Sequence, residues 1–289
     1  MFDELMKRIK QCTSINFHKA CEELDEFVSS STDFDKILAQ IGTIPEAIKH
    51  DSTEEKLFSK VSDAVLARVF RELGLKSTIL SERGDSADVL AQSNFHEYTL
   101  VADAKAFRLS RTAKNQKDFK VASLSAWRKD AEYAVLCSPY FQYPRTQSQI
   151  FAQAVEDNVC LLSWEHMIFL LNHEVRESQS ANLSSLWGFS DFMAQRTTVA
   201  EKKSSFLREF NRFCESVAGA ETGAFDETLV VCIESIKSRG KVEKSYWEAE
   251  RAEILSYSRE QAISELIKNK KIEEKIRQIN SYVGRLTHD

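Results

Sequence analysis

The chain has 289 residues, of which 43% are apolar and 29% charged, with eight glycines and three prolines. This composition is typical of a globular protein and excludes collagen-like or broadly disordered chains. The length allows one large domain or two small ones, folded without a disulfide or a structural metal. No apolar run approaches about 18 residues, and the first twelve residues mix acids and bases, so we expect a cytoplasmic protein without a membrane span or signal peptide.

The N-terminal 50 residues are expected to be helical. Apolar residues recur at helical spacing around Leu5, Leu24 and Ile37, and Gly42 with Pro45 ends this region. A second helix should begin after Ser52, which forms a capping-box pattern with Glu55, and should stop at Gly74.

The central part of the chain changes to the period of strands. Strands are expected at residues 88–91, 98–107, 133–137 and 159–162, with a basic helix after the second and a short helix at 148–155. This order predicts an α/β fold with a mixed central β-sheet flanked by helices. We divide the chain into a helical region (1–50), a core (51–170) and a helical C-terminal region (171–289), expected to form one globular unit.

The C-terminal region is expected to be helical from Trp164 onward. Between Ile263 and Val283 apolar residues recur at three- and four-residue spacings among many Glu and Lys. An amphipathic helix that packs on the protein's own core is the favoured interpretation, and a dimer-forming helix is the alternative.

The charge is unevenly distributed. The net charge is −5, but the segment from Lys105 to Lys129 holds eight basic residues and one acid, Asp118, so that segment carries +7 and the remainder −12. A cationic surface on an acidic body is the usual electrostatic signature of a polyanion-binding protein. The alternative is a solvated face.

Asp88, followed after fourteen residues by Asp103-Ala-Lys105, is the most informative pattern. Asp103 and Lys105 are two apart on a predicted strand, so they project from one face. Two carboxylates supply oxygen ligands for Mg²⁺, and a neighbouring ammonium can meet the charge of a phosphate. This set favours hydrolysis of a phosphodiester, in which positive charge must offset the charge of the transition state.

Other acids remain candidates. Asp103 stands fourteen residues before Asp118-Phe-Lys120 and so forms a second frame, which we favour less because Asp118 lies in a polar, basic stretch. Glu55 is a further candidate catalytic acid that already has a capping role. Glu82 and Asp85 lie in a polar turn where either can approach a metal.

Several enzyme classes are not supported by the sequence. No HExxH, nucleophile elbow, GxxxxGK[ST] or GxGxxG motif occurs. The six cysteines form no CxxC pair, so we expect buried thiols and no structural zinc.

Six stretches of the chain resemble the HindIII family of restriction endonucleases, within the PD-(D/E)xK nuclease superfamily. They are Pro45–Lys49, Ser52–Lys60, Val101–Val121, Phe141–Pro144, Ser148–Phe151 and Ser163–His166. The match is nearly continuous from about Ile44 to His166. Ala87 stands where the superfamily has a proline.

The resemblance implies a bacterial, Mg²⁺-dependent homodimer that cuts double-stranded DNA within AAGCTT, after the first A, and leaves 5′-phosphate ends. Mn²⁺ is expected to substitute for Mg²⁺. A host DNA methyltransferase is implied as protection. The expected metal ligands are Asp88, Asp103 and Ala104, and the expected catalytic residues are Asp88, Asp103, Lys105, Asp118 and Glu55. The expected DNA contacts are Arg108, Arg111, Lys114, Asn115, Gln116, Lys117 and Lys120, because such side chains bond phosphates or base edges.

Two alternatives have different consequences. A repair or junction nuclease on the same core would cut branched DNA without sequence preference. A DNA-binding regulator, in which the carboxylates only balance the basic face, would leave a duplex intact in magnesium.

Overall fold

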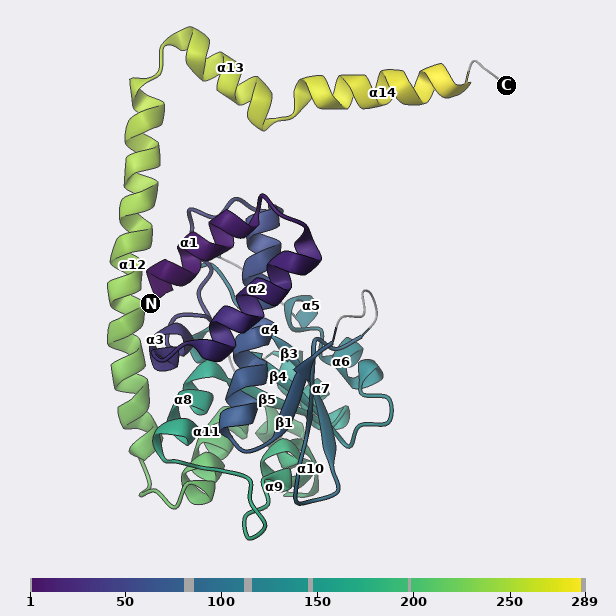
Figure 1. Cartoon of the computed structure of the whole chain (residues 1–289), viewed down its shortest axis with the longest axis vertical. Helices are drawn as coiled ribbons and strands as arrows, with labels where there is room; N and C mark the ends of the chain where they lie inside the picture. The colour runs from purple at the N-terminus through teal and green to yellow at the C-terminus, as the bar shows by residue number, and fades with distance from the viewer. Residues whose placement is uncertain (1, 81–85, 112–115, 145–147, 197–198, 287–289) are drawn as a thin grey trace. The chain divides into compact units, whose positions relative to one another are not determined.

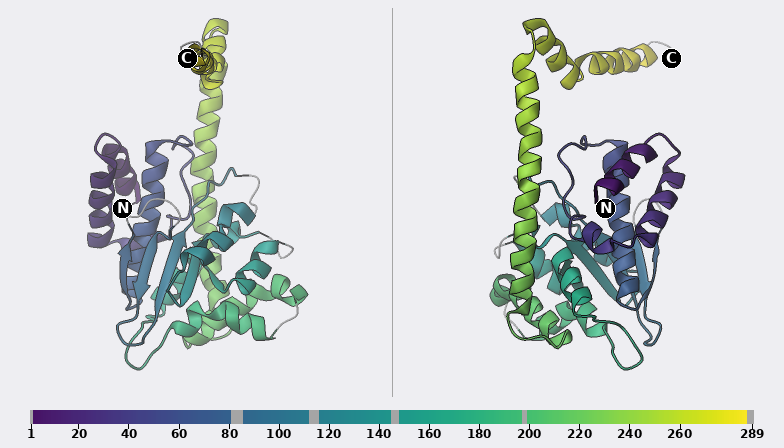
Figure 2. Two further views of the ribbon diagram at one scale, coloured as in Figure 1. Left: turned by 90° about the vertical axis from the view of Figure 1, so that its right-hand side faces the viewer. Right: turned by 60° about the vertical axis from the view of Figure 1, so that its left-hand side comes forward.

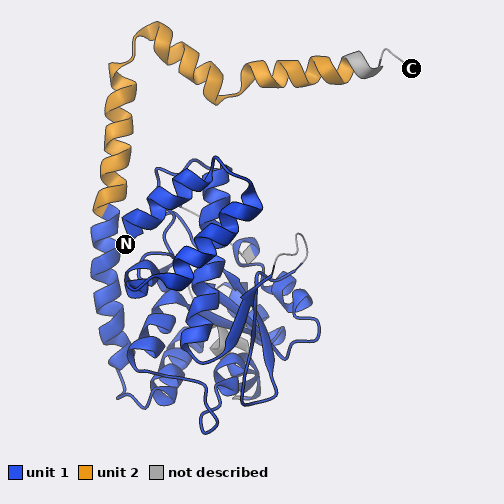
Figure 3. Cartoon of the chain, in the orientation of Figure 1, with its two compact units in different colours: residues 1–240 blue, residues 241–289 orange. Residues whose placement is uncertain are grey.

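A computed structural model of the chain describes residues 2–80, 86–111, 116–144, 148–196 and 199–286. It contains two compact units, residues 1–240 and 241–289 (Figure 3). This division differs from the regions 1–50, 51–170 and 171–289 expected from the sequence, which remain a prediction. Across the described ranges, no helix is long and apolar enough to cross a membrane.

Unit 1 is built around a mixed five-stranded sheet, as the sequence predicts (Figure 1). The strands follow one another in chain order: β1 (Lys76–Ile79), β2 (Val89–Gln92), β3 (Thr99–Ala104), β4 (Tyr133–Ser138) and β5 (Val159–Ser163). The first three pair antiparallel, and β3, β4 and β5 pair parallel. The central strands are almost fully buried because helices cover both faces.

One side of the sheet is covered by α4, which packs on β1, β2 and β3 (Figure 2). The N-terminal helices pack on α4 through an apolar stripe that includes Leu5, Leu24 and Val28. The helices of this side are α1 (Phe2–Cys12), α2 (Phe17–Ser30), α3 (Phe34–Leu38) and α4 (Thr53–Glu72). The helical expectation for the first 50 residues is therefore confirmed up to Leu38.

The remaining helices of unit 1 follow β3. In chain order they are α5 (Gln116–Phe119), α6 (Val121–Trp127), the 3-10 helix η1 (Tyr140–Gln142), α7 (Gln149–Glu156), α8 (Trp164–Asn172), α9 (Ser184–Trp187), α10 (Phe189–Arg196) and α11 (Val199–Val217). Of these, α6 packs on β3, β4 and β5, and α7 packs on β5. The chain continues in α12 (Ala224–Ser256), α13 (Arg259–Asn269) and α14 (Ile272–Leu286), and α12 crosses the boundary between the units.

Three elements differ from the expectations. The strand β1 was not predicted, because it has four residues and only Ser77 is fully buried. The expected strand 98–107 ends at Ala104, so Lys105 lies just beyond it. The expected basic helix is not one helix, because among the described residues after β3 only α5 and α6 are helical before β4.

Candidate active site

The pairing of β2 with β3 brings the first two predicted acids together. Val89 pairs with Ala102, and continuing this register by one residue places Asp88 opposite Asp103. The backbone N–H of Asp88 also donates to the carbonyl of Ala102 over 3.2 Å. Neighbouring residues across an antiparallel pair project from the same face, so the two carboxylates share one side of the sheet.

Lys105 completes this arrangement. Its ammonium donates to Oδ2 of Asp103, whose side chain is only 3% exposed. The backbone N–H of Lys105 donates to the carbonyl of Cys137 over 2.7 Å, so the residue stays fixed to the sheet although β3 has ended. The two-residue spacing therefore places the ammonium beside the carboxylate, as predicted.

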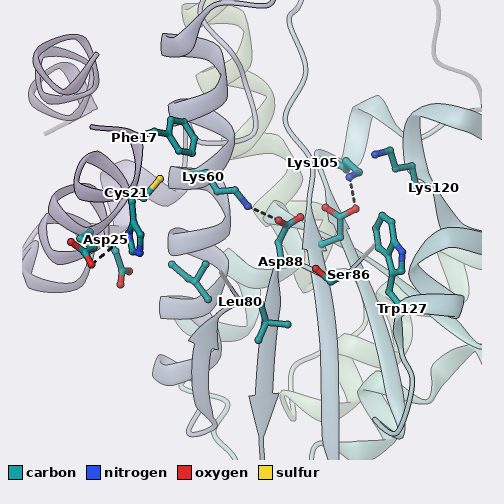
Figure 4. A pocket seen from close by; sticks show the side chains of 14 residues that line it. Phe17, Cys21, Asp25, Lys60, Leu80, Ser86, Asp88, Lys105, Lys120 and Trp127 are labelled. Carbon is teal, nitrogen blue, oxygen red and sulfur yellow. Dashed lines mark hydrogen bonds and ion pairs between the residues drawn. The ribbon is translucent and has the colours of Figure 1, made fainter. Parts of the chain in front are cut away.

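These side chains line a pocket of about 680 Å³ at the end of the sheet (Figure 4). Asp88, Asp103 and Lys105 line it together with Lys60 of α4, and Lys105, Lys120 and Trp127 lie on the other side of Asp88 from Lys60. Phe17, His18, Cys21, Glu22 and Asp25 of α2 line the remaining wall. Its described lining combines acids with the ammonium groups of Lys60, Lys105 and Lys120, so the pocket can accept both a cation and a phosphate.

Helix α4 contributes two charged residues that the sequence analysis did not single out. The ammonium of Lys60 lies 2.6 Å from Oδ1 of Asp88 and 3.1 Å from Oδ2 of Asp63. Asp63 is buried inside the apolar stripe of α4, between Val61 and Val65. A charged residue in the middle of such a stripe is the signal that could have revealed this pair, because it requires a partner when buried.

The electrostatics of the pocket follow from burial and from crowding of acids. Burial raises the pKa of Asp103; Lys105 opposes this rise, and the nearby charge of Asp88 adds to it. Burial likewise raises the pKa of Asp63, and Asp88 adds to that rise. Burial alone would lower the pKa of Lys60, but the charges of Asp63 and Asp88 more than offset it and raise the pKa. The acids thus favour any additional positive charge at this place.

The donor set fits a hard divalent cation. Asp88 and Asp103 offer carboxylate oxygens from opposed positions at the end of the β2–β3 pair. Ala104, the expected main-chain ligand, follows Asp103 at the end of β3 but is not among the described residues that line the pocket. Mg²⁺ prefers such oxygen ligands and keeps several sites for water and phosphate. The crowding of acids around Asp103 supports the fit, because like charges at one site are stabilised by a cation.

Glu55 has different partners. Its Oε1 accepts from Arg108, and its Oε2 accepts from the backbone N–H of Asp51 over 2.7 Å and lies 3.0 Å from Nδ1 of His50. Half of the expected capping box is present, because the backbone N–H of Glu55 donates to Oγ of Ser52, whereas its carboxylate bonds Asp51 instead. Glu55 is not among the described residues that line the pocket.

The ligand atoms of His50, Asp51 and Glu55 lie within 4.8 Å of one another. Both oxygens of Glu55 already accept hydrogen bonds, and His50 and Asp51 are exposed. Burial alone would raise the pKa of Glu55, but the bonds from His50 and Arg108 lower it. This cluster is therefore explained as the N-terminal cap of α4.

The predicted DNA contacts divide into two groups. Arg108 is 18% exposed, and besides Glu55 it donates to the carbonyl of Ile48 over 2.6 Å. Arg111 pairs with Asp118 and lies over the ring of Phe107. Lys117 and Lys120 are exposed, and Arg111 is exposed as well although it is paired.

Some predicted residues lie outside the described part of the chain. They are Lys114 and Asn115 among the DNA contacts and Glu82 and Asp85 among the acids. Gln116 begins α5, but its side chain is also outside the described part.

The two possible frames of the motif differ in geometry. In the first frame Asp88, Asp103 and Lys105 converge in the pocket. In the second frame Lys120 reaches the same pocket, with its ammonium 5.8 Å from the ring of Trp127, but Asp118 turns to Arg111 instead. The first frame thus has all its residues in one pocket, whereas the carboxylate of the second frame pairs with Arg111.

Trp164 is a further residue that the sequence analysis did not select. Its indole N–H donates to the backbone carbonyl of Lys105 over 2.9 Å. Its ring packs against Gly42, where an added Cβ would lie 2.7 Å from it. Trp164 thus holds the backbone of Lys105 from the first turn of α8.

Comparison with known proteins yields one consistent result. The family model described as HindIII restriction endonuclease matches residues 3–283. The curated protein named Type II restriction enzyme HindIII, from Haemophilus influenzae, is 41% identical over 283 residues, which cover 97% of this chain and 94% of that protein.

Proposed function

The chain belongs to the HindIII restriction endonuclease family, and on that premise we propose that the pocket around Asp103 hydrolyses DNA with the help of Mg²⁺. As a Type II restriction endonuclease, the chain cleaves DNA at a specific site. The observation that carries the proposal is the convergence of Asp88, Asp103 and Lys105 in one pocket, at the ends of the adjacent strands β2 and β3.

Asp88, Asp103 and the carbonyl of Ala104 would hold the cation. Once bound, Mg²⁺ supplies positive charge that offsets the negative charge developing on the phosphoryl oxygens. Mn²⁺, which has the same preference for oxygen ligands, should substitute.

Lys105 has two tasks in this proposal. Its ammonium, held beside Asp103, meets the negative charge of the scissile phosphate. It can also donate a hydrogen bond that orients the attacking water. Its fixed backbone, bonded to Cys137 and Trp164, keeps it ready for both tasks without a change of conformation.

Double-stranded DNA is the proposed substrate, and the exposed lysines Lys117 and Lys120 are proposed to contact it. Lys120 lines the pocket itself, which supports a contact with the phosphate at or next to the scissile bond. We assign Arg108 a structural role instead, because its guanidinium is bonded to Glu55 and to Ile48.

A homodimer is proposed as the active form. A palindromic target matches a two-fold symmetric enzyme, because each subunit then contacts the same half-site. The apolar side chains of α13 and α14 support association: taken by itself, unit 2 leaves Ile263, Leu266, Ile276 and Ile279 between 46% and 61% exposed. Such a surface is typical of contact with another protein surface, which was the alternative from sequence.

The recognised site is proposed to be AAGCTT, cut after the first A to leave 5′-phosphate ends. This follows from the resemblance of the core. A host that carries such an enzyme needs protection, so a DNA methyltransferase acting on the same site is also proposed.

A plasmid of known sequence tests the proposal. Incubated with the purified protein and Mg²⁺, it should give discrete fragments, and sequencing of their ends should identify the site and the 5′-phosphates. Without Mg²⁺ it should stay intact. Cleavage confined to branched DNA would instead indicate a junction nuclease, and an intact plasmid in Mg²⁺ would indicate a DNA-binding protein without nuclease activity.

A further inference from the structure

Lys60 is the one ammonium of the pocket that comes from α4, on the side opposite the D-x-K strand (Figure 4). Its Nζ lies 2.6 Å from Oδ1 of Asp88, and its side chain is 33% exposed. Asp88 is one of the two carboxylates proposed to bind Mg²⁺. The ammonium of Lys60 therefore already contacts a carboxylate oxygen of Asp88 that the cation would use.

Asp63 holds Lys60 in this place. The two residues are three apart on α4, so they share a face, and Nζ of Lys60 lies 3.1 Å from Oδ2 of Asp63. Asp63 is 5% exposed at its side chain. A buried carboxylate of this kind is strongly destabilising without a partner, so Lys60 is retained near it whatever happens at Asp88.

The numbers of acidic and basic groups around Asp88 suggest why Lys60 lies there. Among the described residues, the ion pairs at this place join three carboxylates, from Asp63, Asp88 and Asp103, to two ammonium groups, from Lys60 and Lys105. Without a cation, Asp88 and Asp103 repel each other across the β2–β3 register, and Lys60 offsets this repulsion. Once a divalent cation is bound, the same ammonium is an unfavourable neighbour.

We propose that Lys60 is a positioning residue that acts as the counter-ion of Asp88 while the divalent cation is absent and competes with the cation for that carboxylate. When the cation binds, Lys60 keeps its contact with Asp63 and gives up Asp88. The inference rests on the proposed function, because it assumes that Asp88 and Asp103 are cation ligands. On this proposal, Lys60 keeps Asp88 and Asp103 in place when no cation is bound. The same ammonium weakens the binding of the cation.

Binding of Mn²⁺ to the DNA-free protein tests the proposal, because the free ion has an electron paramagnetic resonance signal that the bound ion loses. Lys60→Met should bind Mn²⁺ about tenfold more tightly than the unsubstituted protein, since one nearby positive charge is removed. Lys60→Arg, which keeps the charge, should restore the weaker affinity. Lys56→Met is the matched control: it removes the same charge one turn earlier on α4, where the side chain is exposed, and should change the affinity little.

Equal or weaker binding of Mn²⁺ by Lys60→Met, with a folded protein by circular dichroism, would overturn the proposal. If that variant does not fold, Lys60→Gln removes the charge while keeping a polar group for Asp63, and the same outcomes apply. In the unsubstituted protein, Ca²⁺ should shift the NMR signal of the Lys60 ε-methylene, assigned with Lys60→Arg, and an unmoved signal would contradict the release from Asp88. If Asp103→Asn binds Mn²⁺ as well as the unsubstituted protein, the proposed metal site itself is wrong.

Discussion

The pocket around Asp103 and the basic segment that follows it (residues 105–129) are both rich in charged residues. The charged side chains of the two regions differ in their partners. In the pocket, Asp88, Asp103 and Lys105 converge around one space. In the segment, Arg108 and Arg111 are already paired with Glu55 and Asp118. A motif set by the register of two strands is therefore a better guide to function than a count of charges along the chain.

The difference has a simple physical origin. The positions of Asp103 and Lys105 depend on local strand geometry, which alternation of side chains already fixes. The partner of Arg108 is 53 residues away, on the first turn of α4. No local pattern predicts such a pair, so the net charge of +7 overstates what the segment offers to DNA.

The largest expected effect is at Asp103. Asp103→Asn should lower the rate of plasmid cleavage by more than roughly a thousandfold, because it removes a charged cation ligand. Binding of a duplex in Ca²⁺, measured by fluorescence anisotropy, should survive. Cleavage at an unchanged rate would remove Asp103 from the mechanism.

The next effect separates the two frames of the motif. Lys105→Met should lower the cleavage rate by about a hundredfold to a thousandfold, since the ammonium beside Asp103 is lost. Lys120→Met is the comparison variant and should have a smaller effect on the rate at saturating DNA. A larger loss for Lys120→Met would favour the frame that ends in Lys120.

A substitution at Arg108 tests whether the pair with Glu55 is structural. Arg108→Ala should lower the free energy of unfolding by about 3 kcal/mol, because it leaves a partly buried carboxylate and the carbonyl of Ile48 without their donor. Urea denaturation measures this change. The salt dependence of DNA binding should stay the same, and a flatter dependence would show that Arg108 contacts phosphate.

The same pair should depend on pH in a defined direction. Because the pKa of Glu55 is lowered in the folded protein, its pairing stabilises the fold above the ordinary glutamate pKa of about 4.3, and this stability is lost as the pH falls through the lowered value. The unfolding free energies of Glu55→Gln and the unsubstituted protein should thus differ at pH 7 and converge in acid. A difference that persists in acid would contradict a role for the charge of Glu55.

The smallest effect is expected on the exposed side of the segment. Lys117→Ala should weaken DNA binding a few-fold and reduce the slope of log affinity against log salt by about 0.9, the value for one phosphate contact. Anisotropy titrations in Ca²⁺ at several salt concentrations measure the slope. An unchanged slope would show that Lys117 does not contact the DNA backbone.

Much of the fold could be predicted from the sequence because the apolar periodicity is strong. The helical spacing around Leu5, Leu24 and Ile37 located α1 to α3, and the buried strands β3 to β5 were found within a few residues. The edge strand β1 has no such signal, because it is short and mostly exposed on one side.

The sequence predicted those site residues that lie on one strand or on two paired strands, namely Asp88, Asp103 and Lys105. Lys60 lines the pocket from α4, and Trp164 bonds the backbone of Lys105 from α8. The distance of either helix from β3 is a property of the folded core. Asp63 had a visible sign, a charge within an apolar stripe, but the sign alone does not say which partner satisfies it. Asp118 follows Asp103 at the same spacing as Asp103 follows Asp88, yet its carboxylate forms an ion pair with Arg111.

The antiparallel pairing of β2 with β3 has a consequence for how such enzymes diverge. Asp88 directly precedes β2 and Asp103 is the last residue but one of β3, so the turn that joins the two strands, Ser93 to Tyr98, lies at the far end of the hairpin. Residues inserted into or deleted from that turn would alter the number of residues between the two acids without moving either side chain. A search for distant members should therefore allow gaps there and demand only that the two carboxylates face each other.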